Sequence, residues 1–150
     1  ILIDYPTYDE ENEIVRSTTS WRDLKLETVI KGSDISALQD LVRRVPVSDH
    51  VIDYAVRLVR ATRQSDDSGL DYVKNWVSWG AGPRASQYLI MGAKTRAILD
   101  NRPTPSVEDV RMVAKPVLRH RIVTSFNAEA DGVTAEHIVE RLMDDVKEKS

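Results

Sequence analysis

Apolar residues recur every three or four positions along most of the chain, the spacing of side chains that share one face of an α-helix. Four such stripes predict amphipathic helices. Each stripe follows a residue that can cap its helix. The stripes are Ile35, Leu38, Leu41, Val42 and Val45 after Asp34; Val51, Ile52, Ala55, Leu58 and Val59 after Ser48; Val110, Val113, Ala114, Val117 and Leu118 after Ser106; and Ile138, Val139, Leu142, Met143 and Val146 after Thr134. Stripes of this kind are buried when helices pack together, so the pattern favours a helical bundle.

Caps and helix breakers predict two further helices. Thr7 with Glu10 three residues later is a capping-box pattern, and the helix behind it is expected to end near Thr18 or Thr19. Gly82 and Pro83 predict the start of a helix that runs to about Asp100. The sequence therefore predicts six helices with short connections between them.

Strand signals are weak. The opening "ILIDYP" indicates a short strand or the end of one, and the segment near Leu26 to Ile30 is a second candidate. The predicted fold class is therefore all-α, a bundle of about six helices, allowing for a short strand remnant at the N-terminus and minimal β structure.

Composition narrows the function classes. A chain of 150 residues is long enough for one domain with a sizeable core. Its net charge of −3 argues against a domain that coats nucleic acid, although a local basic patch is compatible with it. It has no cysteine, which suits a reducing compartment, and we expect a cytoplasmic protein. No apolar run reaches the roughly 18 residues of a membrane span.

No catalytic constellation is visible in the sequence. The phosphate-binding loop G-x-x-x-x-G-K-[ST], the zinc motif H-E-x-x-H and the nucleophile motif G-x-S-x-G are all missing. His50, His120 and His137 fall on different predicted helices without ligand spacing, so no metal site is predicted.

Two other segments allow more than one interpretation. Tyr72, Trp76 and Trp79 could stack on a base, but aromatic residues so close to a turn more often belong to a core or an interface. The basic run "LRHR", residues 118 to 121, stands at a predicted helix end, where cations complement the helix dipole. A contact with phosphate or with the carboxylate of a partner is the alternative.

The stretch "GAGPRAS" places a cation where the helix dipole disfavours one. Gly82 fits the N-cap and Pro83 the first helical position, so Arg84 falls in the positive first turn of a helix that buries Leu89, Ile90 and Ala93. An anionic ligand such as phosphate would favour arginine there. The alternative is a surface arginine paired with a nearby carboxylate, which the local sequence alone favours.

The order and spacing of several blocks resemble a known family. "VIDYAVRLVRATR", "GAGPRAS" and "VEDVRMVAKPVLRHRI" together resemble the C-terminal lid of MoxR-family AAA+ ATPases, and "IDYPTYDEENEIV" resembles the segment that leaves the nucleotide-binding core of that family. The resemblance runs from about Ile3 to Val146. It implies that residues 1–8 are an exit segment from the core and residues 9–150 the helical lid. The usual family block is Gly-Ala-Ser-Pro-Arg, and Gly82 replaces the serine here.

The resemblance implies a role for Arg84. In AAA+ proteins this arginine is sensor 2, which reaches from the lid toward the β- and γ-phosphates and acts in the catalytic cycle of the full-length protein. Gly82, Pro83 and Ala85 are expected to lie near the nucleotide with it. A guanidinium offers charge and two parallel donors to phosphate oxygens, so the residue type agrees with the role.

The same resemblance implies what the chain lacks. The phosphate-binding loop, the magnesium-binding acidic motif, sensor 1 and the arginine finger belong to a core that would precede Ile1. ATP and Mg²⁺ are thus expected cofactors of the full-length protein, whereas the fragment alone is expected to bind neither and to be inactive.

The implied function is that of a lid in a chaperone-like ATPase that remodels or matures protein complexes. Its expected partners are its own AAA+ core, neighbouring subunits of a hexameric ring, and proteins with a von Willebrand A-type domain; a membrane or nucleic acid is not expected. The alternative is a free-standing helical module that binds protein or DNA. A basic stripe for DNA is interrupted by acidic residues, among them Asp49 and Asp53.

Overall fold

The computed structural model describes residues 3–21, 25–65 and 70–148. These residues form two compact units, one up to Ala37 and one from Leu38 onward. The elements within the described ranges are α1 (Tyr8–Thr19), α2 (Gly32–Arg44), α3 (Asp49–Arg60), α4 (Asp71–Trp76), β1 (Val77–Trp79), α5 (Pro83–Leu99), α6 (Val107–Leu118), β2 (Val123–Thr124), α7 (Phe126–Ala130) and α8 (Ala135–Asp145). The helical fold class is confirmed, with two short helices more than the sequence predicts.

The first unit contains α1, whose start agrees with its predicted cap. The Thr7 N–H donates to the Glu10 carboxylate at 2.8 Å, and the Glu10 N–H donates to the Thr7 hydroxyl at 3.4 Å. The two predicted strands are wrong for the described residues. Residues 3–6 and 25–30 have no strand structure, and Ile1 and Leu2 lie outside the described residues. A short apolar run without a partner strand leaves its backbone groups unpaired, and the described chain offers these segments no such partner.

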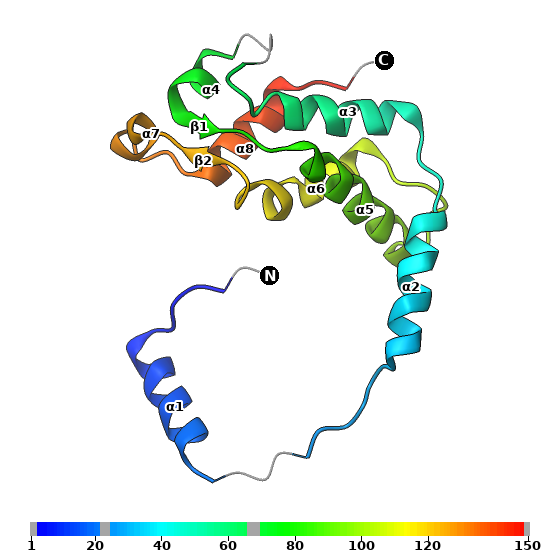
Figure 1. The fold of residues 1–150 in the computed structure, drawn as a ribbon, viewed down its shortest axis with the longest axis vertical. Helices are drawn as coiled ribbons and strands as arrows, with labels where there is room; N and C mark the ends of the chain where they lie inside the picture. Colours follow the sequence, from blue (N-terminus) through cyan, green and yellow to red (C-terminus); the bar gives the residue numbers. More distant parts are fainter. Residues whose placement is uncertain (1–2, 22–24, 66–69, 149–150) are drawn as a thin grey trace. The chain divides into compact units, whose positions relative to one another are not determined.

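The core of the second unit lies among α3, α5, α6 and α8, which Figure 1 shows packed side by side. The predicted apolar stripes of α3, α6 and α8 supply half of its buried residues, as periodic burial requires. Its largest fully buried side chains are Tyr54, Leu58, Leu89, Leu118, Ile138 and Leu142.

Parts of two predicted stripes face outward. In α2, Ile35, Leu38 and Leu41 are about half exposed, and the described residues of this helix bury none of their side chains. In α3, Ile52 is also exposed, because it lines an open apolar groove together with Met91 of α5. The spacing of apolar residues predicted the helices correctly but overstated how much of each stripe is buried.

A two-stranded sheet joins segments far apart in the sequence, at the end of the unit where α4 and α7 also lie (Figure 1). Strands β1 and β2 are antiparallel, with Val77 opposite Thr124 and Trp79 opposite Val123. The Ser125 N–H extends the pairing by donating to the Trp76 carbonyl at 2.8 Å. This sheet fixes the direction in which the chain enters the segment before α5.

Candidate functional site

The start of α5 presents Arg84 to solvent. Gly82 is the N-cap with extended backbone (φ −83°, ψ 175°), and Pro83 is the first helical residue, as the sequence predicts. The Arg84 side chain is exposed, and the first turn of the helix contains no acidic residue. Within the described part of the chain, no carboxylate forms an ion pair with Arg84. The surface ion pair that would explain this arginine without a ligand therefore finds no support among these residues.

Thr62 fixes the segment before α5 against the end of α3. Its buried hydroxyl accepts the Ala81 N–H at 2.8 Å and donates to the Val59 carbonyl at 2.7 Å. Arg63 Nε donates to the Ala81 carbonyl at 3.0 Å. Gly80 passes so close that a Cβ there would lie 2.4 Å from the Thr62 carbonyl oxygen, so no larger residue fits. Nothing in the sequence pattern pointed to this role of Thr62.

The other residues of "GPRA" have different environments. The Ala85 methyl is fully buried, and the Ala85 N–H donates to the Gly82 carbonyl at 2.9 Å. Pro83 has no N–H. Gly82 is exposed, and a Cβ there would meet nothing within 4 Å, so the family's serine would fit this position. Arg84 is thus the group in this segment best placed to reach an anion, and the contacts of the other three with nucleotide remain predictions.

The chemistry of these residues fits phosphate. A guanidinium at a helix start adds its donors to a positive end of the helix dipole. The described residues contain no cluster of three or more His, Cys, Asp or Glu that could hold a metal ion. His137 caps α8 by accepting the Thr134 N–H at 3.3 Å, and His50 lies 3.9 Å from Glu148, so these two histidines are engaged with nearby residues. The described part of the chain therefore offers an exposed cation at this helix start and no such cluster for a metal ion.

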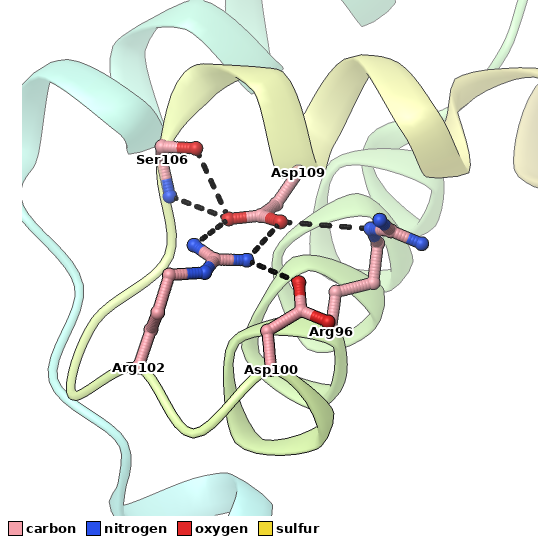
Figure 2. Close-up of polar contacts among 5 residues, drawn as sticks. All are labelled: Arg96, Asp100, Arg102, Ser106 and Asp109. Carbon is pink, nitrogen blue, oxygen red and sulfur yellow. Dashed lines mark hydrogen bonds and ion pairs between the residues drawn. The ribbon is translucent and has the colours of Figure 1, made fainter.

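The opposite end of α5 is closed by an ionic network around one buried carboxylate, which Figure 2 shows. Arg102 donates from both terminal nitrogens to the Asp109 carboxylate, at 2.7 and 2.6 Å, and from one of them to Asp100 at 2.9 Å. The Ser106 N–H donates to the same Asp109 carboxylate at 2.8 Å. Arg96 Nε lies 3.5 Å from it. The network ties the end of α5 to the start of α6.

Asp109 is the buried member of this network, with 3% of its surface exposed. Its hydrogen bonds from the Arg102 guanidinium, aided by those from Ser106, lower the pKa of the carboxyl group to about 2 against the opposing effect of burial. The hydrogen bonds from Ser106 also make Asp109 part of the cap of α6. The pairing with Arg102 was missed, because nothing in the local pattern shows which way the loop between the two residues turns.

The basic run "LRHR" divides between two environments. Arg119 forms an ion pair with Glu136 of α8 at 3.1 Å. Arg121 Nη1 donates to the Val117 carbonyl in the last turn of α6, which agrees with the expected role of a cation at a helix end. The Arg121 guanidinium also covers the Tyr88 ring, 4.9 Å from its centroid.

The aromatic residues near β1 have different surroundings. Trp76 Nε1 donates to Asp131 at 2.8 Å and the Tyr72 hydroxyl donates to Asp145 at 2.8 Å, so both rings are fixed within the fold. Their partial burial against the core agrees with the structural interpretation of these residues. Trp79 remains 75% exposed.

Comparisons with known proteins agree with this architecture. The family model of the AAA lid domain matches residues 72–142. Over 146 residues the chain is 34% identical to Chaperone MoxR1 from Mycobacterium tuberculosis, an alignment that covers 97% of the chain and 38% of that protein. Over 148 residues it is 31% identical to the uncharacterized protein YeaC from Bacillus subtilis, covering 98% and 43%.

A crystal structure from Cytophaga hutchinsonii, assigned as an ATPase, superimposes with a TM-score of 0.78 and 27% identity, covering 99% of this chain and 45% of that one. The chain thus spans less than half the length of the curated relatives it matches.

The family model identifies the kind of domain, and the relatives identify the protein family. The region from α4 to α8 is an AAA lid domain, and it includes the whole of α5 with Arg84. The chain belongs to the lid regions of MoxR-type AAA+ ATPases. No helix within residues 3–21, 25–65 and 70–148 is long and apolar enough to cross a membrane.

Proposed function

We propose that this chain is the nucleotide-sensing lid of an oligomeric AAA+ ATPase and that Arg84 is its sensor 2 residue. The observation that carries the proposal is an exposed guanidinium, without a carboxylate partner among the described residues, on a helix start that Thr62 and the buried Ala85 hold in place. Membership of the lid family supports a nucleotide as the anion it meets. Gly82, Pro83 and Ala85 would lie beside the nucleotide with it.

The physical basis of sensing is differential binding. The full-length protein would bind ATP together with Mg²⁺. ATP would supply the γ-phosphoryl group that is transferred to water. Arg84 would bind phosphate oxygens whose number and charge change when the γ-phosphate leaves. A residue that binds one nucleotide state more tightly than the other shifts the equilibrium between lid positions. Because α5 is packed into the core of the unit, a shift at Arg84 moves a rigid body rather than a loose loop.

The wider role follows from the family. We infer that the lid contacts its own AAA+ core and neighbouring subunits of a ring, expected to be hexameric, and that the assembly remodels or matures other protein complexes. The name of the relative Chaperone MoxR1 supports the chaperone-like part. Partners with a von Willebrand A-type domain and a cytoplasmic location complete the proposal; the lack of cysteine agrees with a reducing compartment.

The test is Arg84→Ala and Arg84→Lys in the full-length protein, with Arg141→Ala as the matched control, because Arg141 is another exposed arginine of the same unit. Arg84→Ala should lower steady-state ATP turnover by about tenfold to a hundredfold, since a charge-assisted contact in a closed site contributes about 1.5–3 kcal/mol. Arg84→Lys should recover part of the loss. Unchanged turnover in Arg84→Ala would contradict the sensor role.

A further inference from the structure

The segment after α6 brings a second cation close to the head of α5. The Cζ atom of Arg121 lies 4.9 Å from the centroid of the Tyr88 ring. Tyr88 follows Arg84 by four residues in α5, so these two side chains share one face of the helix. Arg84, Tyr88 and Arg121 form what we call the arginine–tyrosine cluster, in which Tyr88 follows Arg84 by one helical turn and its ring is covered by the guanidinium of Arg121.

The charge of this cluster has no counterpart within the described ranges. Arg119, two residues before Arg121, is neutralised by Glu136 at 3.1 Å. Arg121 instead donates to the Val117 carbonyl and contacts the ring of His120, and among the described residues no carboxylate forms an ion pair with it or with Arg84. Unpaired like charges repel each other, and an anion that bound both would remove that cost.

Stacking on Tyr88 also orients the Arg121 guanidinium. A guanidinium that covers a ring uses its face for the contact and leaves its N–H groups in the plane of the fork. Nη1 is engaged with Val117, whereas no described residue accepts a hydrogen bond from Nε or Nη2. Two adjacent donors in one plane match the oxygens of a phosphate group.

We propose that Arg121 is a second phosphate-binding residue of the lid, so that Arg84 and Arg121 together bind the polyphosphate chain of the nucleotide. Tyr88 is the positioning residue, because stacking on its ring fixes the orientation of the Arg121 guanidinium. This inference rests on the proposed function of Arg84 and extends it by one binding residue. A polyphosphate is the occupant that fits, because its charge is spread over several groups and can meet both guanidinium groups, whereas a single carboxylate of a neighbouring subunit would neutralise one.

The first experiment uses this chain and inorganic tripolyphosphate at high concentration, because the chain without its core is expected to bind no nucleotide tightly. Titration followed by nuclear magnetic resonance reports the Nε–H signals of the arginines and the ring signals of Tyr88. We expect the signals of Arg84, Arg121 and Tyr88 to shift with one dissociation constant. Arg84→Gln and Arg121→Gln should each weaken binding by roughly threefold, a typical loss for an exposed charge contact.

Arg141→Gln is the matched control, because this arginine also stacks on aromatic rings, with Cζ 4.1 Å from the Tyr72 centroid and 5.4 Å from that of Trp76. It should leave tripolyphosphate binding unchanged. If Arg121→Gln has no more effect than Arg141→Gln, Arg121 is not part of the site and the inference is overturned.

The second experiment measures ATP affinity by calorimetry in the full-length protein. We expect Arg84→Gln and Arg121→Gln each to weaken binding by about tenfold, the loss of one charge-assisted contact in a closed site. A loss confined to Arg84→Gln would overturn the inference and leave the proposed function standing. No loss in either variant would overturn both. If Arg121→Gln dissociates the ring and leaves ATP affinity intact, Arg121 meets a partner carboxylate and the inference is wrong.

Tyr88 separates positioning from binding. Tyr88→Phe keeps the ring and should keep the ATP affinity, whereas Tyr88→Leu should weaken it toward the value of Arg121→Gln. In the Arg121→Gln background, Tyr88→Leu should have no further effect on affinity, because the residue it positions is gone. Equal losses from Tyr88→Leu with and without Arg121 would contradict the positioning role.

Discussion

The two ends of α5 each carry arginine, and the same side chain is used in opposite ways. At the head, Arg84 is exposed and has no carboxylate partner among the described residues. At the tail, Arg102 makes two hydrogen bonds to the buried Asp109, and Arg96 approaches the same carboxylate (Figure 2). Arginine joins two helices where its charge is matched inside the fold, and it remains available to a ligand where its charge is unmatched.

The helix dipole makes this contrast sharper. Cations near the C-terminal end of a helix are stabilised by the partial negative charge there, so Arg96 and Arg102 are favourable even before Asp109 is counted. Arg84 occupies the positive end, where the dipole opposes it. An internal ion pair thus explains the tail, whereas the described residues offer the head no such partner.

The comparison assumes that both ends belong to one rigid helix, and Leu89→Ala tests that assumption with the largest expected effect. Leu89 is fully buried in the middle of the packed face of α5. Its truncation removes apolar contacts and leaves a cavity, so the free energy of unfolding should fall by about 2–5 kcal/mol. Urea unfolding measures it, and a midpoint that hardly moves would show that α5 is not anchored as described.

Asp109→Asn disrupts only the ionic network at the C-terminal end of α5. The amide keeps the shape but removes the charge that Arg102 and Arg96 face, so the free energy of unfolding should fall by about 2–3 kcal/mol. Arg84→Ala is the matched change at the head, and because no internal partner is lost it should stay within about ±0.5 kcal/mol. Equal losses at the two ends would remove the distinction between them.

The pH dependence of stability isolates the Asp109 contribution. The pKa of Asp109 is lowered to about 2, below the value of an unfolded chain, so the stabilisation is present above about pH 4 and is lost as the pH falls toward 2. The difference in free energy of unfolding between the natural chain and Asp109→Asn should therefore shrink by about 2 kcal/mol over that interval. A difference that stays constant would show that the carboxylate is not the charged partner.

The features that the sequence predicted are local ones. Thr7 and Glu10 form the predicted capping box, and Thr134 caps its helix as expected, because a cap depends only on residues about three apart. The exposed position of Arg84 behind Gly82 follows in the same way from the order of residues at a helix start. Local rules are enough wherever both partners lie within one turn.

The features that the sequence missed depend on distant segments. The pairing of Val77 with Thr124 requires α5 and α6 to bring the two strands together. No residue pattern within either strand indicates that pairing. The same is true of Tyr88 and Arg121, which meet only because α6 packs on α5. The strand predicted near Leu26 failed for the complementary reason, since an apolar run does not reveal whether a partner strand exists.

Gly82→Ser is the smallest and most selective change at the head. A Cβ at this position meets nothing within 4 Å, and a serine hydroxyl can accept a backbone N–H of the first turn, which a glycine N-cap cannot. We expect a gain in the free energy of unfolding of a few tenths of a kcal/mol by urea titration, roughly the difference between glycine and serine caps. A loss of stability would show that the described start of α5 is wrong.

The most direct test of the account is the discrimination between ATP and ADP by the full-length protein. If Arg84 senses the γ-phosphate, Arg84→Ala should weaken ATP binding by about tenfold and ADP binding by clearly less, so that the ratio of the two dissociation constants falls. Calorimetry with a hydrolysis-resistant ATP analogue and with ADP gives both constants. A ratio that is unchanged in Arg84→Ala, with the thermal stability of the chain also unchanged, would contradict the sensor role.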